Sequence, residues 1–185
     1  MNINTNYNLQ CRSQTDICEH LPTLRRYALE CKHITEMGMR DACSTWAFLD
    51  AKPVRMISYD LETPSKLEYI KGCCKEEGID YEFRKESTLD AKIDETDLLF
   101  IDTLHTYDQL KMELDLHSNK VGKYMIFHDT ETYGEIGETP GGAILNPEIK
   151  GLNYAIRKFL AKNKNWNIKE VFSNNNGLTI LERGK

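Results

Sequence analysis

Two short apolar runs of this sequence, DLLFID and YMIFHD, are each followed by side chains that could bind a metal or move a proton. The first run closes on Asp102, with His105 shortly after it, and the second closes on His128 and Asp129. Carboxylate oxygens are the hard ligands that Mg²⁺ prefers, so the two aspartates are candidate ligands of a divalent cation. An imidazole titrates near neutrality, which makes His105 a candidate general base. A histidine that only caps a helix or fills the core is the alternative for His105.

A parallel sheet would bring these residues together. Between the two runs lies an amphipathic helical pattern, and strand, helix, strand is typical of a β-α-β unit in a buried parallel sheet. We therefore predict neighbouring strands at 98–102 and 124–129. Ligands of open sheets gather outside the carboxyl ends of the strands, where Asp102 and Asp129 would both lie.

The rest of the chain predicts the same alternation of strands and helices. Earlier strands are expected at residues 33–37, 54–60 and 81–87. A helix is expected at 148–163, and the two β-rich runs on either side of 174–177, which reads NNNG, indicate a hairpin. We predict an α/β fold: a three-layer, Rossmann-like sheet of about seven strands, mostly parallel, with a C-terminal antiparallel hairpin.

The chain is expected to form one domain over residues 15–185, because 185 residues suffice for a single core. Residues 1–14 look like a flexible N-terminal arm. Residues 131–147 are too long and glycine-rich for a simple connection, and we predict a lid that hinges at its glycines over a ligand. An unstructured surface loop is the alternative for this segment.

The turn after the first predicted strand is a second candidate binding site. It contains Glu36, Gly38, Arg40, Ser44 and Thr45. A glycine lets the backbone approach a ligand closely, and the N-terminus of the following helix offers free N–H groups. An ordinary strand-to-helix turn with a capped helix is the alternative.

Taken together, these stretches resemble the class I S-adenosylmethionine-dependent methyltransferases. Their first motif is approximately E-x-G-x-x-x-G-x-S-T, which here runs from Glu36 to Thr45 with Ala42 in place of the second glycine. A positive φ at Ala42 would cost about 1 kcal/mol. The resemblance implies that this turn binds the methionine end of the cofactor. The contacts it implies there are those of Glu36, Gly38, Arg40, Ser44 and Thr45.

The later strands carry the rest of the resemblance. Asp60 ends the second strand, where the family has an acid that grips the ribose hydroxyls, and Glu86-Ser87 occupy the place of an acid and a serine near the adenine. The two apolar runs are similar to small-molecule methyltransferases related to macrolide-sugar O-methyltransferases and cephalosporin-hydroxylase-like proteins. In that subgroup the fourth strand reads D-L-[LI]-F-I-D-G-x-H-x-Y and the fifth ends in H-D or E-D. Here Thr103-Leu104 replace the usual Gly-Asp before the histidine.

This resemblance implies an enzyme that uses S-adenosylmethionine to O-methylate a small hydroxylated molecule, such as a sugar or glycosylated metabolite. It places Asp102 beside both the cofactor and the reacting atoms, with His105 as the base. A Mg²⁺ ion would be held by Asp102, His128 and Asp129. A catalytically degenerate, nucleotide-binding module with this fold is the alternative, since Ala42 and Thr103-Leu104 depart from the motifs. A nicotinamide-dependent oxidoreductase would need G-x-G-x-x-G after the first strand, where this chain has only Gly38.

Composition narrows the expected partners. The formal net charge of −5 disfavours nucleic acid, and no apolar run approaches the roughly 20 residues that span a bilayer. The polar N-terminus lacks a signal-peptide core, so we expect a cytoplasmic protein with a small-molecule acceptor. The six cysteines include no C-x-x-C pair, which favours reduced thiols over a zinc site. A homo-oligomer is left open.

Overall fold

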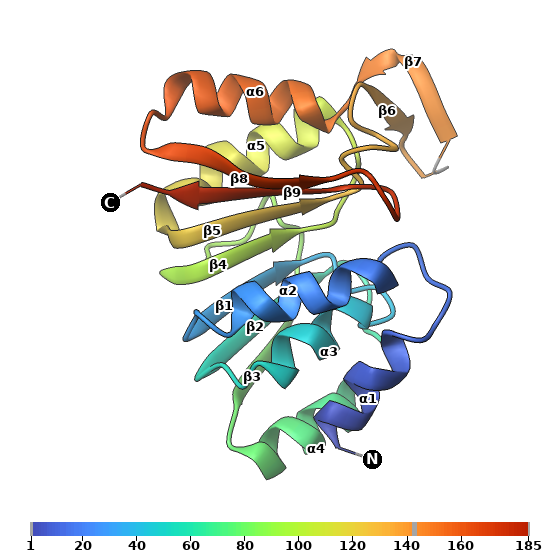
Figure 1. Cartoon of the computed structure of the whole chain (residues 1–185), viewed down its shortest axis with the longest axis vertical. Coiled ribbons are helices and arrows are strands. Elements are labelled where there is room, and N and C mark those ends of the chain that lie inside the picture. Colours follow the sequence, from blue (N-terminus) through green and yellow to red (C-terminus); the bar gives the residue numbers. More distant parts are fainter. Residues whose placement is uncertain (1, 142–143, 185) are drawn as a thin grey trace.

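A seven-stranded sheet forms the centre of the computed structural model, which describes residues 2–141 and 144–184. The strands are β1 (His33–Met37), β2 (Arg55–Asp60), β3 (Asp80–Lys85), β4 (Thr96–Ile101), β5 (Val121–His128), β8 (Trp166–Phe172) and β9 (Leu178–Arg183). Their order is β3-β2-β1-β4-β5-β9-β8 (Figure 1). The first five run parallel, whereas β9 is antiparallel to both β5 and β8. The predicted mostly parallel sheet with a C-terminal hairpin is confirmed.

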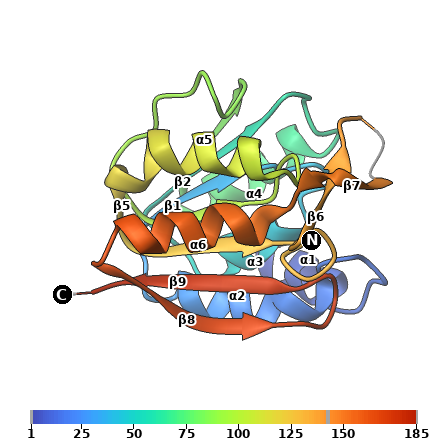
Figure 2. The ribbon, with the colours of Figure 1, turned by 90° about the horizontal axis from the view of Figure 1, so that it is seen from above.

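Helices cover both faces of this sheet. One face carries α2 (Leu21–Ala28), α3 (Cys43–Asp50) and α4 (Leu67–Glu77), and the other carries α5 (Tyr107–His117) and α6 (Leu152–Lys162). In Figure 2, α2 and α5 lie on opposite sides of the strands. None of the helices in the described part of the chain has the length and apolar character needed to cross a membrane.

Strand β4 shows why both faces are covered. Because strand side chains alternate, Leu98 and Phe100 pack toward α2 and α3, whereas Leu99 and Ile101 pack toward α5 and α6. All of these side chains are buried. A strand that is apolar on both faces needs a helical layer on each side, which gives the three-layer architecture.

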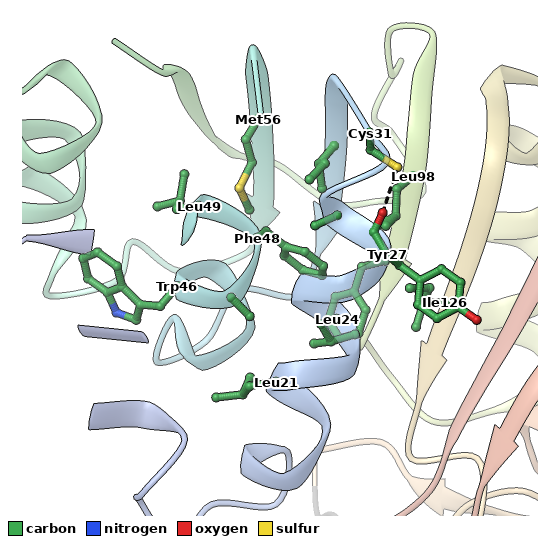
Figure 3. Packing of buried hydrophobic residues seen from close by; sticks show 14 of the residues in the cluster. Leu21, Leu24, Tyr27, Cys31, Trp46, Phe48, Leu49, Met56, Leu98 and Ile126 are labelled. Atoms are coloured by element: carbon green, nitrogen blue, oxygen red, sulfur yellow. Dashed lines mark hydrogen bonds between the residues drawn. The ribbon is translucent and has the colours of Figure 1, made fainter. Parts of the chain in front are cut away.

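The first helical layer fixes the helix that begins beside the candidate site. Figure 3 shows Leu24 of α2 and Phe48 of α3 packed together over the sheet. The rings of Phe48 and Phe100 lie 5.3 Å apart in an edge-to-face arrangement, and Phe48 is fully buried. Helix α3 is thereby held with its first turn at the carboxyl end of β1.

The N-terminal segment differs from the flexible arm that we expected. Residues Ile3–Gln10 form α1, whose Ile3 is fully buried in the same hydrophobic cluster as α3. The side chain of Asn2 caps the helix by accepting a hydrogen bond from the Thr5 N–H, and Asn4 donates one to Asp50. This polar sequence lacks an apolar period, so the capping and tertiary hydrogen bonds that hold the helix could not be read from it. The short helix η1 (Cys18–His20) then leads into α2.

The predicted lid also has regular structure. Strands β6 (Ile136–Thr139) and β7 (Ile144–Lys150) pair as a separate two-stranded sheet, so the helix expected from residue 148 begins only at Leu152. The hinging role of its glycines stays a prediction. A Cβ atom at Gly134 would lie 2.2 Å from the Thr130 carbonyl oxygen, so this glycine permits close packing. Gly142 lies outside the described residues.

Candidate functional site

Two adjoining clefts open at the carboxyl ends of β1, β2 and β4. The larger cleft, of about 460 Å³, is lined by six of the residues predicted to bind a cofactor: Gly38, Arg40, Asp60, Glu86, Ser87 and Asp102. The smaller cleft, of about 260 Å³, also borders Gly38, Arg40 and Asp102, and it extends to His105 and Glu138. Asp102 therefore stands between a cleft of cofactor size and the histidine predicted to act on a substrate.

Gly38 makes this junction possible. It has a φ of +87°, and a Cβ atom there would lie 1.8 Å from the Asp102 carbonyl oxygen. The backbone around it is fixed, because the Gly38 N–H donates to the Tyr59 carbonyl and the Asp102 N–H donates to the Met37 carbonyl. No side chain could be accommodated at Gly38, which borders both clefts.

Asp60 lines the larger cleft and also braces the turn after β1. Its Oδ2 atom accepts hydrogen bonds from the Met39 N–H at 2.9 Å and the Arg40 N–H at 2.8 Å. The guanidinium of Arg40 in turn donates to both carboxylate oxygens of Asp16, at 2.9 and 3.0 Å. The turn is strained, because Ala42 adopts a φ of 65° in the left-handed region.

Glu36 and Thr45, both predicted to contact the cofactor, line neither cleft. The Glu36 carboxylate is fully buried beneath the turn and accepts hydrogen bonds from the hydroxyls of Ser44 at 2.6 Å, Thr45 at 2.9 Å and Ser58 at 2.6 Å. Of the residues in this network, Ser44 reaches the wall of the smaller cleft. Burial raises the pKa of Glu36 to about 7, against the effect of the three hydroxyls. The network lies beneath the turn and supports it, and the predicted contacts of Glu36 and Thr45 with a cofactor stay predictions.

Thr103 and Leu104, which replace the Gly-Asp of the fourth-strand motif, have separate effects on the site. Thr103 turns its hydroxyl toward the buried Glu113, to which it donates at 2.9 Å. Leu104 lines the larger cleft and adds an apolar surface to its wall. Thr103 and Leu104 therefore leave the larger cleft open, and Leu104 makes one side of it less polar.

The predicted metal ligands do come together. One ligand atom each from Asp102, His128 and Asp129 lies within 4.8 Å of the others. Asp129 adopts a φ of 60°, which is strained for a residue with a side chain and is typical of functional positions. The three residues come from the ends of β4 and β5, as the parallel register of these strands requires.

The hydrogen bonds of this cluster test whether a cation would fit. The Nε2 atom of buried His128 lies 3.1 Å from the Asp16 carbonyl oxygen and 3.2 Å from that of Asn175, so it carries the proton. Its Nδ1 atom faces Asp102 Oδ2 at 3.4 Å and Asp129 Oδ2 at 3.3 Å. That nitrogen and the Oδ1 atom of Asp129 are buried without a hydrogen-bond partner. Backbone acceptors on one imidazole nitrogen and oxygens around the other are what a metal-binding histidine needs, so the residues fit a divalent cation.

His105 lies beside this cluster, and its ring stacks on that of Tyr133 at 4.7 Å. Its Nε2 atom is 2.9 Å from Asp129 Oδ2 and 3.3 Å from Asp102 Oδ1. Burial favours the neutral ring, but the two aspartates outweigh it and raise the pKa of His105 to about 10. The two aspartates therefore favour the protonated ring, whereas a general base must be neutral before the reaction. The role of His105 as base stays a prediction.

Two contacts of the candidate site were not predicted from the sequence. Glu138 lies on β6 and reaches His105, although nothing in the sequence distinguishes it from the other acids of the predicted lid. Asp16 holds His128 through its backbone carbonyl, a contact that residue types cannot reveal.

No protein-family model matches the sequence, and no curated protein matches it either. Solved structures do share its fold. An O-methyltransferase from Bacillus cereus in complex with S-adenosylhomocysteine has a TM-score of 0.65 and 14% identity, over 98% of this chain and 90% of that one. A methyltransferase from Podospora anserina, also bound to S-adenosylhomocysteine, has a TM-score of 0.62 and 15% identity, over 99% and 88%.

A third similar structure is the 1,6-didemethyltoxoflavin-N1-methyltransferase of Burkholderia thailandensis, with a TM-score of 0.67 and 9% identity. It aligns over 94% of this chain and 80% of that one. At such identities the likeness concerns the fold, and it shows that this chain has the Rossmann-like fold of these methyltransferases. The fold implied by the sequence resemblance is thus confirmed.

Proposed function

We propose that this protein is an S-adenosylmethionine-dependent methyltransferase that methylates a hydroxyl group of a small molecule, such as a sugar or glycosylated metabolite. One observation carries the proposal: Asp102 borders both the larger cleft and the smaller cleft that contains His105. A cofactor in the first and an acceptor in the second would meet there. The methyltransferases of similar fold that bind S-adenosylhomocysteine support this choice of cofactor.

The walls of the larger cleft suit an adenosyl group. Asp60 Oδ2 accepts two backbone hydrogen bonds, whereas Oδ1 accepts one from the Glu62 N–H and could accept another from a ribose hydroxyl. Such charge-assisted bonds are stronger than neutral ones. Glu86 and Ser87 line the same cleft beyond the end of β3, where the adenine would lie. Gly38 leaves backbone space for the methionine end of the cofactor.

We further propose that Asp102, His128 and Asp129 hold a divalent cation. When bound, such an ion lowers the pKa of an acceptor hydroxyl and holds its oxygen. The support is the buried Nδ1 atom of His128, which faces Asp102 and Asp129, together with the buried Oδ1 atom of Asp129, which accepts no hydrogen bond. A nitrogen ligand suits Mn²⁺, Co²⁺ or Zn²⁺ better than Mg²⁺, so we propose this class of ion in place of the Mg²⁺ first predicted.

Methyl transfer from a sulfonium is an in-line displacement, so the protein must align the acceptor and accept its proton. His105 borders the smaller cleft with Nε2 beside Asp102 and Asp129, and we propose that it takes that proton. To do so it must first lose the proton that the two carboxylates hold on it.

Calorimetric titration with S-adenosylhomocysteine tests the proposal. Wild type should bind, and Asp60→Ala should bind at least 10-fold more weakly, a loss of about 1.4 kcal/mol. Glu62→Ala is the matched control, because only the backbone N–H of Glu62 contacts Asp60. Lack of binding by the wild type would overturn the proposal. Binding without turnover of S-adenosylmethionine on a panel of sugars and phenols, with each divalent ion, would favour the nucleotide-binding module instead.

A further inference from the structure

Glu138 of the β6–β7 hairpin is joined to His105 by a reciprocal pair of hydrogen bonds. The His105 backbone N–H donates to Glu138 Oε1 at 2.8 Å, and the Glu138 N–H donates to the His105 carbonyl at 3.1 Å. The Glu138 side chain is 8% exposed. The hairpin is therefore tied to the loop that follows β4 at the residue predicted to move a proton.

The same carboxylate also faces the imidazole ring. Glu138 Oε1 lies 2.9 Å from His105 Nδ1, whereas Nε2, on the opposite edge of the ring, points to Asp129 and Asp102. The Nδ1 contact is an ion pair without an aligned hydrogen bond. With Tyr133 stacked on one face, the ring is held at both edges and from one side.

Burying a carboxylate is unfavourable for folding unless a partner compensates its charge. Burying a charge costs several kcal/mol when no partner compensates it. Among the described residues, the ion pair that Glu138 forms is with His105. A serine or threonine could have accepted the same backbone hydrogen bond without that cost, so the charge itself points to a role toward the ring.

The hairpin backbone lies in close contact with its surroundings at this position. A Cβ atom at Gly137 would lie 2.7 Å from Ile149 Cγ2 and 3.1 Å from the His105 carbonyl oxygen. The backbone next to Glu138 is thus seated directly against its partner strand and against His105. A carboxylate carried on a rigid element can fix the orientation of the group it contacts.

We propose that Glu138 is a positioning residue that holds the His105 ring with Nδ1 toward its own carboxylate, so that Nε2, on the side of Asp102 and Asp129, is the nitrogen that takes the proton of the acceptor. This inference rests on the proposed methyltransferase function. A carboxylate beside one imidazole nitrogen favours the proton there and leaves the lone pair on the other, as in catalytic triads. Glu138, which orients the ring in this proposal, lies 33 residues after His105 in the sequence.

Proton NMR of protein labelled with ¹⁵N tests the orientation directly. At pH 7 the wild type should show a downfield, slowly exchanging proton on His105 Nδ1, and Glu138→Gln should lose it. Glu135→Gln is the matched control, because Glu135 lies beside the same hairpin but pairs with exposed Arg157. Absence of the signal from the wild type, or its persistence in Glu138→Gln, would overturn the proposal. Absence of the signal from the wild-type spectrum overturns the proposal even if the variant does not fold.

Kinetics separate this role from a merely structural one. In Glu138→Gln we expect kcat to fall by roughly 100-fold or more, with KM within about threefold and unchanged affinity for S-adenosylhomocysteine. Equal kcat in Glu138→Gln and Glu135→Gln would count against positioning and leave the methyltransferase proposal intact. Failure of the wild type to bind S-adenosylhomocysteine would remove the proposed function, while the NMR signal would still show whether Glu138 orients the ring.

Discussion

The backbone of Gly38 approaches that of Asp102 so closely that a Cβ atom at Gly38 would lie 1.8 Å from the Asp102 carbonyl oxygen. The ends of β1 and β4 meet here, and Gly38 and Asp102 border both clefts. The contact links the turn expected to bind a cofactor with the acid expected to border the reaction.

Replacing this glycine should damage both stability and binding. We expect Gly38→Ala to lower the free energy of unfolding by more than about 2 kcal/mol, because the side chain meets backbone and φ is +87°. Binding of S-adenosylhomocysteine should be lost. Gly72→Ala in α4 is the control, since a Cβ atom there meets nothing within 4 Å, and it should stabilise the helix by about 0.5–1 kcal/mol. Denaturant unfolding measures both, and a neutral Gly38→Ala would contradict the geometry.

The strain at Ala42 predicts a stabilising substitution. Ala42 adopts a φ of 65°, which glycine tolerates without steric cost. We expect Ala42→Gly to raise the free energy of unfolding by up to about 1 kcal/mol, because relief of strain exceeds the added entropy of the unfolded chain. Ala47→Gly, in the interior of α3, should instead destabilise the protein. If both variants lose stability alike under urea, the left-handed conformation at Ala42 is not costly.

Cation binding should release protons and strengthen with pH. The two neighbouring carboxylates outweigh burial and raise the pKa of His128 to about 10, so a cation must displace a proton from Nδ1 at neutral pH. Isothermal titration in two buffers of different ionisation enthalpy should detect this release, with Mn²⁺, Co²⁺ or Zn²⁺ bound more tightly than Mg²⁺. His128→Ala should weaken binding by roughly 10-fold or more. His33→Asn, at the opposite end of β1, should not, and equal losses in both variants would refute the site.

Glu36 should make stability depend on pH. Burial raises its pKa to about 7, so between pH 4.5 and 7 the folded state keeps a proton that the unfolded chain has released. Stability contributed by this group is therefore present below about pH 4.5, falls as pH rises to 7, and is constant above that value. Relative to Glu36→Gln, the wild type should lose at most about 3 kcal/mol across this range. Urea unfolding at several pH values gives the difference, and a flat difference would show that Glu36 is not perturbed.

The sheet and the cluster at its edge were determined by local features of the sequence. Apolar runs that alternate with amphipathic helices specify parallel strands, because such strands are covered on both faces. The position of an acid at the end of each run then decides that Asp102 and Asp129 meet, since parallel strands end at the same edge. The sequence around Gly177 likewise predicted the hairpin between β8 and β9.

Only the tertiary structure decided what surrounds that cluster. Glu138 reaches His105 because the β6–β7 hairpin docks on a distant loop, and Asp16 acts through a carbonyl that every residue type possesses. Glu36 was predicted to contact a ligand, yet the packing of α3 places it beneath the turn, where three hydroxyls occupy it. Strand and helix periods depend on neighbours in sequence, whereas burial, hairpin docking and backbone acceptors depend on contacts between residues far apart in the chain, which no local pattern encodes.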